Sequence, residues 1–459
     1  MNSRTASPAF VILSVPAITV FLVAAAYVFP DKLAYVVAVP LGFFLILLTW
    51  HNPRIIALAV VAMIPLGTFA EISQTMSRLT LFKVLFPLPF TVLVIGMALG
   101  RFGHPRIHFL DKWIFCWVAI NIFLIASSLD KGDAMSFCRR FASLSLLYFM
   151  ITRFFCEEGR YRILTQTLII STLVSAFIGF AIYLTGSHTF FSRENLRMTG
   201  ASGIGPGSYT ASLFLPIWLS LSLAMTARGT TGKILYYAIA LVIASVIPLT
   251  LSRSGALVFG ITVFFGLVIW RKKLTVVHCG VIVAMIMISM IFVPQSFWER
   301  ASRLTEMTDT NISDYSLWRR MNYLDVGWNI ISDYPFLGAG PGNFPNLHAD
   351  ARYQKEISLV GTKRLPHNMY MQVISETGML GGIFFAGVMI SALITTLGGL
   401  GQAGHHDATA RGLLLTLTGL LLMGLFSHML LTKYFWLTLA FVRIRGEDMA
   451  IPEHHIKPL

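Results

Sequence analysis

A histidine at the start of an apolar segment has the position and the chemistry of a general base. His367 lies in Pro366-His367-Asn368, and proline followed by asparagine is typical of the first residues of a helix. A helix N-terminus favours anions and lowers the pKa of a nearby imidazole. A neutral imidazole is suited to take a proton from a sugar hydroxyl. Position alone also fits an ordinary interfacial histidine, so both interpretations stay open.

One acidic residue lies inside the same apolar segment. Glu376 follows His367 by nine residues, which is about 13 Å along a helix. An ionisable group that deep in an apolar span is costly and is usually functional or paired. Because Glu376 is too far along the helix to touch the same atoms as His367, we interpret it as a structural intramembrane residue that pairs with a buried polar or basic group.

Several arginines supply the groups that bind phosphate. Arg253 lies between two apolar runs, Arg197 precedes a glycine-rich stretch, and Arg319 and Arg320 are adjacent in a polar segment. Guanidinium groups bind phosphate bidentately, so two or three that converge would form a diphosphate clamp. The alternatives are that Arg253 snorkels to the membrane surface and that Arg319 and Arg320 form a solvated helix face.

The composition indicates that these residues are positioned by membrane helices. Hydrophobic residues make up 56% of the 459 residues and charged residues 12%, whereas a soluble domain carries about 25% charged residues. The apolar runs have the length that spans a bilayer as helix and do not alternate as barrel strands do. We therefore predict an all-α, polytopic transmembrane helical bundle of about 12–14 spans. The expected spans are 9–29, 33–50, 55–70, 79–100, 111–129, 140–155, 163–185, 208–226, 233–251, 254–270, 275–293, 367–397, 412–428 and 430–443.

The first apolar run is longer than the core of a signal peptide, so we interpret it as an uncleaved span.

Five regions follow from the pattern of apolar runs. The regions are an N-terminal transmembrane bundle (1–190), transmembrane helices with Arg-bearing outer loops (191–293), a long outer loop (294–366), C-terminal transmembrane helices (367–445) and a cytoplasmic tail (446–459).

Basic residues in short loops predict the orientation. The cluster Arg271-Lys272-Lys273 places the following segment, 294–366, at the outer face, and Arg443 and Arg445 are assigned to an inner loop. Some basic residues remain on the outer side, where short loops usually avoid them, and an anionic ligand would explain their presence. They are Arg139, Arg140, Arg193, Arg197 and Arg253.

The long outer loop contains an amphipathic helix followed by a glycine-rich turn. Its apolar residues recur at spacings of 4, 3, 4 and 3, which is typical of one face of a helix on the membrane surface or over the bundle. The stripe is Leu317, Met321, Leu324, Trp328 and Ile331, and the helix is expected to end at Asp333. The glycines that follow permit a tight turn.

Several function classes lack their signature. The chain has no GxxxxGK[ST] motif, no DxD-like metal pair in an outer loop, and four cysteines without metal-ligand spacing. His405-His406-Asp407 and His454-His455 are interpreted as solvated inner residues. The net charge of +14 fits basic loops rather than nucleic acid binding. We expect no cofactor, no metal and no nucleic acid partner.

Four blocks, in this order, resemble the O-antigen ligase/polymerase (Wzy-like) superfamily of membrane glycan transferases. Together they span about the C-terminal 60% of the chain, and the last two are the most specific. They read RMTGASGIGPGSYTASLFLP, LTLSRSGALVFG, RRMNYLDVGWNIISDYPFLGAGPGNF and LPHNMYMQVISETGMLGG. The residues Gly205-Pro206-Gly207-Ser208 stand where relatives often have Asp-Pro-Asn, so polar side chains there are not assigned to the donor.

The resemblance implies a GT-C-like fold and a metal-independent glycosyltransferase of the bacterial inner (plasma) membrane with a periplasmic active site. It implies an undecaprenyl-diphosphate-linked glycan donor, and lipid A-core or a growing glycan as acceptor, in a membrane lipid environment. His367 matches the family's essential histidine and is the expected catalytic residue, while Arg197 and Arg253 would bind the diphosphate. Arg319, Arg320 and Asn368 are expected contacts of the acceptor or loop.

Other functions remain open from the sequence. A polymerase of O-antigen or exopolysaccharide units differs only in its acceptor, and a protein O-glycosyltransferase would share the same loop blocks. A secondary transporter or lipid flippase would show inverted repeats and charges near the midplane. No repeat is visible, and the notable charges gather near one face.

Overall fold

The computed structural model describes a bundle of helices with one short antiparallel strand pair. The described residues are 33–67, 71–73, 79–102, 107–156, 158–185, 197–202, 204–271, 280, 287, 315–402 and 405–448. The predicted spans 9–29 and 275–293, apart from residues 280 and 287, lie outside these residues, as do Arg193, the start of the long loop and the C-terminal tail from residue 449.

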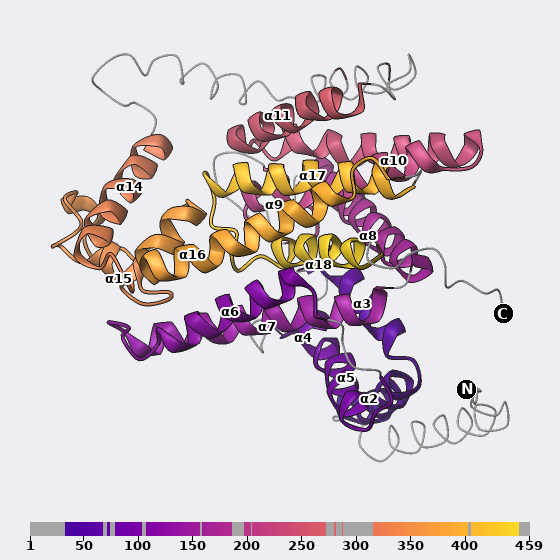
Figure 1. The fold of residues 1–459 in the computed structure, drawn as a ribbon, viewed down its shortest axis with the longest axis horizontal. Helices are drawn as coiled ribbons and strands as arrows, with labels where there is room; N and C mark the ends of the chain where they lie inside the picture. The colour runs from indigo at the N-terminus through magenta and orange to yellow at the C-terminus, as the bar shows by residue number, and fades with distance from the viewer. Residues whose placement is uncertain are drawn as a thin grey trace.

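The described elements follow one another in chain order (Figure 1). They are α2 (Leu33–His51), α3 (Pro53–Met63), β1 (Glu71–Ser73), β2 (Leu79–Thr80), α4 (Leu81–Leu85), α5 (Pro87–Ala98), α6 (Phe109–Phe123), α7 (Lys131–Phe155), α8 (Glu158–Thr185), α9 (Pro206–Thr226), α10 (Thr230–Leu249), α11 (Arg253–Trp270), α14 (Tyr315–Asp333), α15 (Phe344–Ala349), η4 (Ile357–Leu359), α16 (Met369–Gly398), α17 (His405–Gly424) and α18 (Lys433–Asp448). The β1–β2 pair is antiparallel.

Six helical segments among the described residues are long and apolar enough to cross a membrane, or seven if α2 and α3 form one broken span. This confirms a polytopic helical membrane protein. The two spans expected at 33–50 and 55–70 meet at a bend of 116°, because Pro53 opens α3 and cannot continue the hydrogen bonds of α2. The spans expected near 111–129 and 430–443 are the shorter helices α6 (15 residues) and α18 (16 residues).

The centre of the bundle is α9. In its 18-residue apolar stretch 89% of the residues are buried, whereas in that of α11 only 28% are. It packs between α10 and α17. The approach of α17 is close because a Cβ added at Gly412 would meet the Trp218 carbonyl at 2.8 Å, and one at Gly419 would meet the Phe214 ring at 2.6 Å. Small residues at such contacts are typical of helix packing in membranes.

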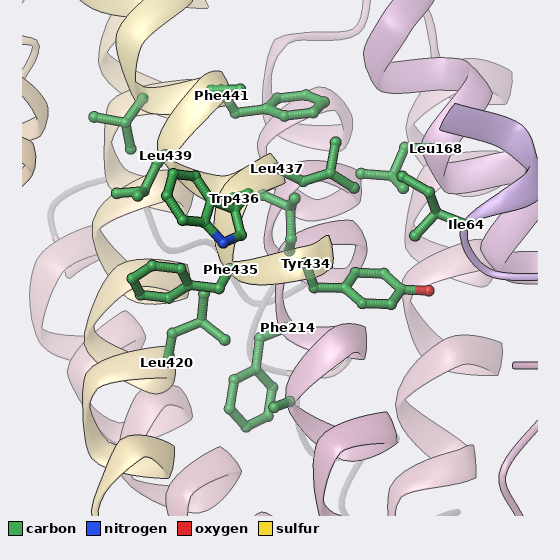
Figure 2. Close-up of a cluster of buried hydrophobic side chains, with 14 of the residues drawn as sticks. Ile64, Leu168, Phe214, Leu420, Tyr434, Phe435, Trp436, Leu437, Leu439 and Phe441 are labelled. Atoms are coloured by element: carbon green, nitrogen blue, oxygen red, sulfur yellow. The ribbon is translucent and has the colours of Figure 1, made fainter. Parts of the chain in front are cut away.

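Helix α18 is enclosed by the other helices, because every residue from 434 to 446 is buried. Figure 2 shows its aromatic and leucine side chains beside Phe214 of α9 and Leu168 of α8. The prediction that Arg443 and Arg445 lie in an inner loop is therefore wrong. Both are 4% exposed, and Arg443 donates to Asp111 at 2.9 Å. Burial requires that pairing, since an unpaired charge in the core is costly.

The residues around Asp407, which were expected to be solvated inner residues, differ from that expectation. Asp407 is 1% exposed and lies in the first turn of α17, where it accepts hydrogen bonds from Gly401 N and Arg411 Nε, both at 2.9 Å. Arg411 also donates to the Ile269 carbonyl at the end of α11. The carboxylate therefore accepts from a backbone N–H just before α17, and the guanidinium donates to a backbone carbonyl at the end of α11.

A small second core caps the opposite end of the bundle, beside the start of α16 (Figure 1). Helix α14 ends at Asp333, as predicted, but it turns a different face to the protein. Its buried side chains are Tyr323, Val326 and Ile330, whereas Met321 is 49% and Trp328 62% exposed. The predicted stripe therefore includes outward-facing residues, and an outward tryptophan suits a membrane interface.

Candidate functional site

His367 occupies a strained backbone position immediately before α16. Its φ is 45°, in the left-handed region that residues with a side chain rarely adopt. Asn368 is the N-cap, and its Oδ1 accepts hydrogen bonds from the N–H groups of Tyr370 and Met371, both at 3.0 Å. Such strain persists where surrounding structure enforces it and is common at functional sites. The expected helix start is confirmed, and the Asn368 side chain is engaged as the cap.

Two rings hold the imidazole of His367 in place. Tyr323 of α14 stacks on it with ring centroids 5.6 Å apart, and His428 contacts it edge-on at 5.2 Å. His428 lies between α17 and α18, and its Nδ1 is buried without a hydrogen-bond partner among the described residues. The three rings come from three different parts of the chain, so His367 marks the point where the cap meets the bundle.

The surroundings keep both imidazoles neutral at neutral pH. The pKa of His367 falls from 6.5 to about 4, chiefly through loss of hydration, then through electrostatic interaction with His428, Arg320, Arg319 and Arg364. Burial likewise lowers the pKa of His428. Part of the His367 surface is still exposed to solvent, so its loss of hydration is incomplete. A neutral His367 can accept a proton.

Arg253 is the first residue of α11, and Arg197 braces the turn that presents it. The Ser252 side chain caps α11 by accepting from Gly255 N. Arg197 Nε and a terminal nitrogen donate to the carbonyls of Thr250 and Leu251 at 3.2 and 2.9 Å. Leu251 has a φ of 52°, so the brace stabilises a strained turn. The structure thus places the two arginines beside each other, with two Arg197 donors on the turn.

Hydrogen bonds connect this turn to the histidine pair. The first turn of α9 reaches the α10–α11 turn through Thr210 and Thr250, whose hydroxyls are 2.9 Å apart. On its other side, the Ser208 hydroxyl is 3.5 Å from that of Ser427, the residue before His428. Arg253 and His367 therefore lie at the same end of the bundle.

The helices that begin at this end of the bundle include α9, α11 and α16. Helix N-termini carry partial positive charge and unpaired N–H groups. Together with Arg253, they give this region an electrostatic preference for an anion such as phosphate. The helices α10 and α17 end on this side at Leu249 and Gly424, neither of which carries a carboxylate.

Glu376 anchors the glycine-rich turn rather than a basic side chain. Its carboxylate, 1% exposed, faces the backbone N–H groups of Gly342 and Phe344 and accepts from Gln372 Nε2 at 3.4 Å. Helix α16 breaks two residues later at Gly378, with φ 62° and ψ −166°. The turn docks on this break, because Gly340 N donates to the Glu376 carbonyl at 2.9 Å.

An apolar groove begins one turn below His367, between α16 and α17. Its volume is about 410 Å³, and apolar side chains form nearly all of its lining. At the end of the groove nearest His367, the Tyr370 hydroxyl donates to the Leu421 carbonyl at 2.7 Å. The groove continues along α16 to Ile390. A groove of this composition suits a hydrocarbon chain that extends from the site into the membrane.

The sequence did not single out Tyr323, His428 or Arg364. Tyr323 looked like an ordinary position outside the apolar stripe, and Arg364 like one of several loop charges. His428 offered one signal, because it ends a predicted span on the same side as His367. Arg319 and Arg320 are half-buried on α14 and act electrostatically on His367.

Comparison with known proteins gives one match to a protein family. No curated protein matches the chain. The model of the family Wzy_C, described as O-Antigen ligase, matches residues 238–386, about a third of the chain. The matched segment includes Arg253, α14, the glycine-rich turn and His367, whereas Arg197 lies before it. This match confirms the resemblance seen in the sequence and supports assigning the protein to an O-antigen ligase-like family.

Proposed function

We propose that the protein transfers a glycan from undecaprenyl diphosphate to a hydroxyl of an acceptor at the outer face of the bacterial inner membrane. The observation that carries this proposal is the location of His367 and Arg253 at one end of the bundle, where α9, α11 and α16 begin. The family match supports a lipid-linked glycan donor and a glycan or lipid acceptor in general terms.

In this proposal the donor's diphosphate binds at the α11 N-terminus. Arg253 contacts the phosphate oxygens and offsets the charge that builds on the leaving group. Arg197 contributes mainly by holding the turn, because two of its donors bind the carbonyls of Thr250 and Leu251. The groove along α16 takes the isoprenoid chain of the donor.

His367 acts on the acceptor in the proposed reaction. Its neutral imidazole takes the hydroxyl proton while the hydroxyl oxygen attacks the anomeric carbon. The bond between that carbon and the diphosphate oxygen breaks, and undecaprenyl diphosphate leaves. Direct displacement inverts the anomeric centre. His428 and Tyr323 fix the ring of His367 in the orientation for proton transfer.

The proposal is tested by alanine substitution in a strain that lacks the chromosomal gene. His367→Ala and Arg253→Ala should abolish the transferred or long-chain glycan, raise the lipid-linked glycan and leave the protein in the membrane. His51→Ala changes an exposed histidine at the end of α2 and is the matched control. Wild-type glycan in either of the first two variants would reject the assignment.

The same strain distinguishes a ligase from a polymerase. Loss of a ligase leaves long glycan on the lipid carrier and bare acceptor, whereas loss of a polymerase leaves single repeat units attached to the acceptor. The alternatives share the site chemistry, so the substitutions above apply to both.

A further inference from the structure

The ring that stacks on His367 rests in turn on a second, buried histidine. His348 of α15 is fully buried, and its ring centroid lies 5.2 Å from that of Tyr323. Tyr323 stacks on His367 with centroids 5.6 Å apart. Packed interiors have low compressibility and transmit displacements from one side chain to the next. His348 therefore backs the ring that orients the proposed base, although the proposed reaction gives it no role.

Both ring nitrogens of His348 have a partner. Its Nδ1 lies 2.8 Å from the carbonyl oxygen of Thr362, an atom that can only accept a hydrogen bond. Its Nε2 lies 3.2 Å from Nε2 of Gln354. Thr362 is five residues before His367 in the chain. His348 thus contacts the segment that leads to the base as well as the ring that stacks on the base.

The neighbours of Gln354 determine where the proton of His348 lies. The backbone N–H of Glu356 can only donate, and it lies 3.0 Å from Gln354 Oε1, so Oε1 is the acceptor end of the amide. The amide also exchanges two hydrogen bonds with that of Asn322, at 2.7 and 2.9 Å. Because Gln354 Nε2 is a donor, His348 Nε2 must accept. The single proton of a neutral ring is then on Nδ1, where it is donated to Thr362.

We propose that His348, as the neutral tautomer with its proton on Nδ1, is a positioning residue that holds Tyr323 and the segment before α16 in place around His367. This inference rests on the proposed function and adds a residue that acts through others. Asn322 precedes Tyr323 on α14, so the Gln354 amide joins that helix to His348. Burial lowers the pKa of His348, which agrees with a neutral ring.

A carboxylate at position 354 would reverse the hydrogen bond to His348. Glutamate is close to glutamine in shape, but both of its oxygens accept when it is ionised. Gln354→Glu should therefore draw a second proton onto His348, because an imidazolium can donate to the carboxylate and to Thr362 together. The carboxylate also lacks the donor that Asn322 Oδ1 accepts from in the native protein. We expect α14 to shift and Tyr323 to leave its stacked position.

Solid-state NMR of the full-length protein in lipid bilayers, with ¹³C- and ¹⁵N-labelled histidine, measures these protons without turnover. The signals of His348 and His367 are assigned by their loss in His348→Asn and His367→Ala. In the wild type, His348 should show a protonated Nδ1 and an unprotonated Nε2. Gln354→Glu should show both nitrogens protonated, together with a shifted His367 signal. A wild-type His348 that carries its proton on Nε2 would overturn the proposal, and this measurement needs no variant that might unfold.

Tyr353→Phe is the matched control in the same small core. The Tyr353 hydroxyl donates to Asp333 at 2.7 Å, so this variant also removes one hydrogen bond from α14. Asp333 lies ten residues after Tyr323, about 15 Å along the helix. The control should leave the His348 and His367 signals unchanged. A His367 shift as large as that in Gln354→Glu would mean general loosening of the cap and would contradict the positioning role.

Transfer assays separate positioning from binding, with the lipid-linked glycan extracted from the deletion strain as the donor. Gln354→Glu should lower kcat about ten- to hundredfold, as expected when a catalytic group is displaced by about 1 Å, and leave the donor KM unchanged. Tyr353→Phe should keep the wild-type kcat. A raised donor KM with an unchanged kcat in Gln354→Glu would refute positioning. A wild-type protein that transfers no glycan would reject only the proposed function, because the NMR measurement does not depend on turnover.

Discussion

The break in α16 at Gly378 offers a sharp test of how the cap is attached to the bundle. A Cβ at this position would lie 2.3 Å from the Phe336 carbonyl oxygen and 2.6 Å from Gly338 N. Both atoms are backbone atoms of the glycine-rich turn, so neither can move without displacing the turn. The φ of 62° and ψ of −166° also belong to a region that only glycine adopts readily.

Gly378→Ala should therefore destabilise the protein by two separate effects. The strained dihedral angles cost about 1–3 kcal/mol, and the steric overlap costs about 1–3 kcal/mol, which together predict a loss of about 2–6 kcal/mol. Unfolding by SDS in mixed micelles, followed by tryptophan fluorescence, measures the free-energy difference. Transfer activity should fall as well, because the displaced turn carries α14 and the Tyr323 ring.

Gly382→Ala supplies the control within the same helix. A Cβ there would lie 3.8 Å from Ile374 Cγ1, an ordinary contact, and alanine favours a helix over glycine by about 1 kcal/mol. This variant should be as stable as the wild type or more so. If Gly378→Ala were equally stable and active, the docking of the turn on the helix break would not position the site.

Four further predictions concern His367, its neighbours and the apolar groove. His428→Asn removes a group that lowers the pKa of His367, so the acid limb of the pH–rate profile should move to higher pH; an unchanged limb would contradict the contact. The folded-state pKa of His367 lies below its ordinary value of 6.5. The contribution of His367 to stability is therefore present above pH 6.5 and declines as the pH falls toward about 4. Denaturation curves recorded across this pH range check the direction of this change. Asn368→Ala removes the cap of α16 and should cost about 1 kcal/mol, whereas Asn368→Asp should retain most of it in the same unfolding assay. Ala386→Trp fills the apolar groove and should raise the KM for a long-chain lipid donor more than for a short-chain one; equal effects would separate the groove from the donor.

The fold was predictable where a local pattern determines it. Apolar runs identified the membrane helices, and Asp333 marked the end of α14. The face that α14 buries was not predictable, because the helix has apolar residues on two sides and the protein-facing side depends on Gly327. A Cβ there would meet Met371 Sδ at 2.3 Å, so glycine at position 327 allows α16 to approach α14. Because Met371 lies 44 positions later in the chain, the local sequence of α14 does not reveal this contact.

Polar residues inside helices were harder to interpret than polar residues in loops. The positive-inside rule counts basic residues near span ends. It cannot reveal that Arg443 is buried against Asp111, which lies 332 positions earlier in the chain. Glu376 was expected to need a buried partner, but its partners are backbone N–H groups of a distant turn, which no side-chain pattern reveals. His428 became visible as part of the site only through its ring contact with His367.

Photo-crosslinking tests the central claim most directly. A polyprenyl diphosphate with a photoreactive group beside the diphosphate is bound to the protein in nanodiscs, irradiated, and the labelled peptides are mapped by mass spectrometry. The shared site predicts labels in two segments at once, residues 250–254 and 366–371. Labels confined to the other end of the bundle, around Asp111 and Arg443, would contradict it.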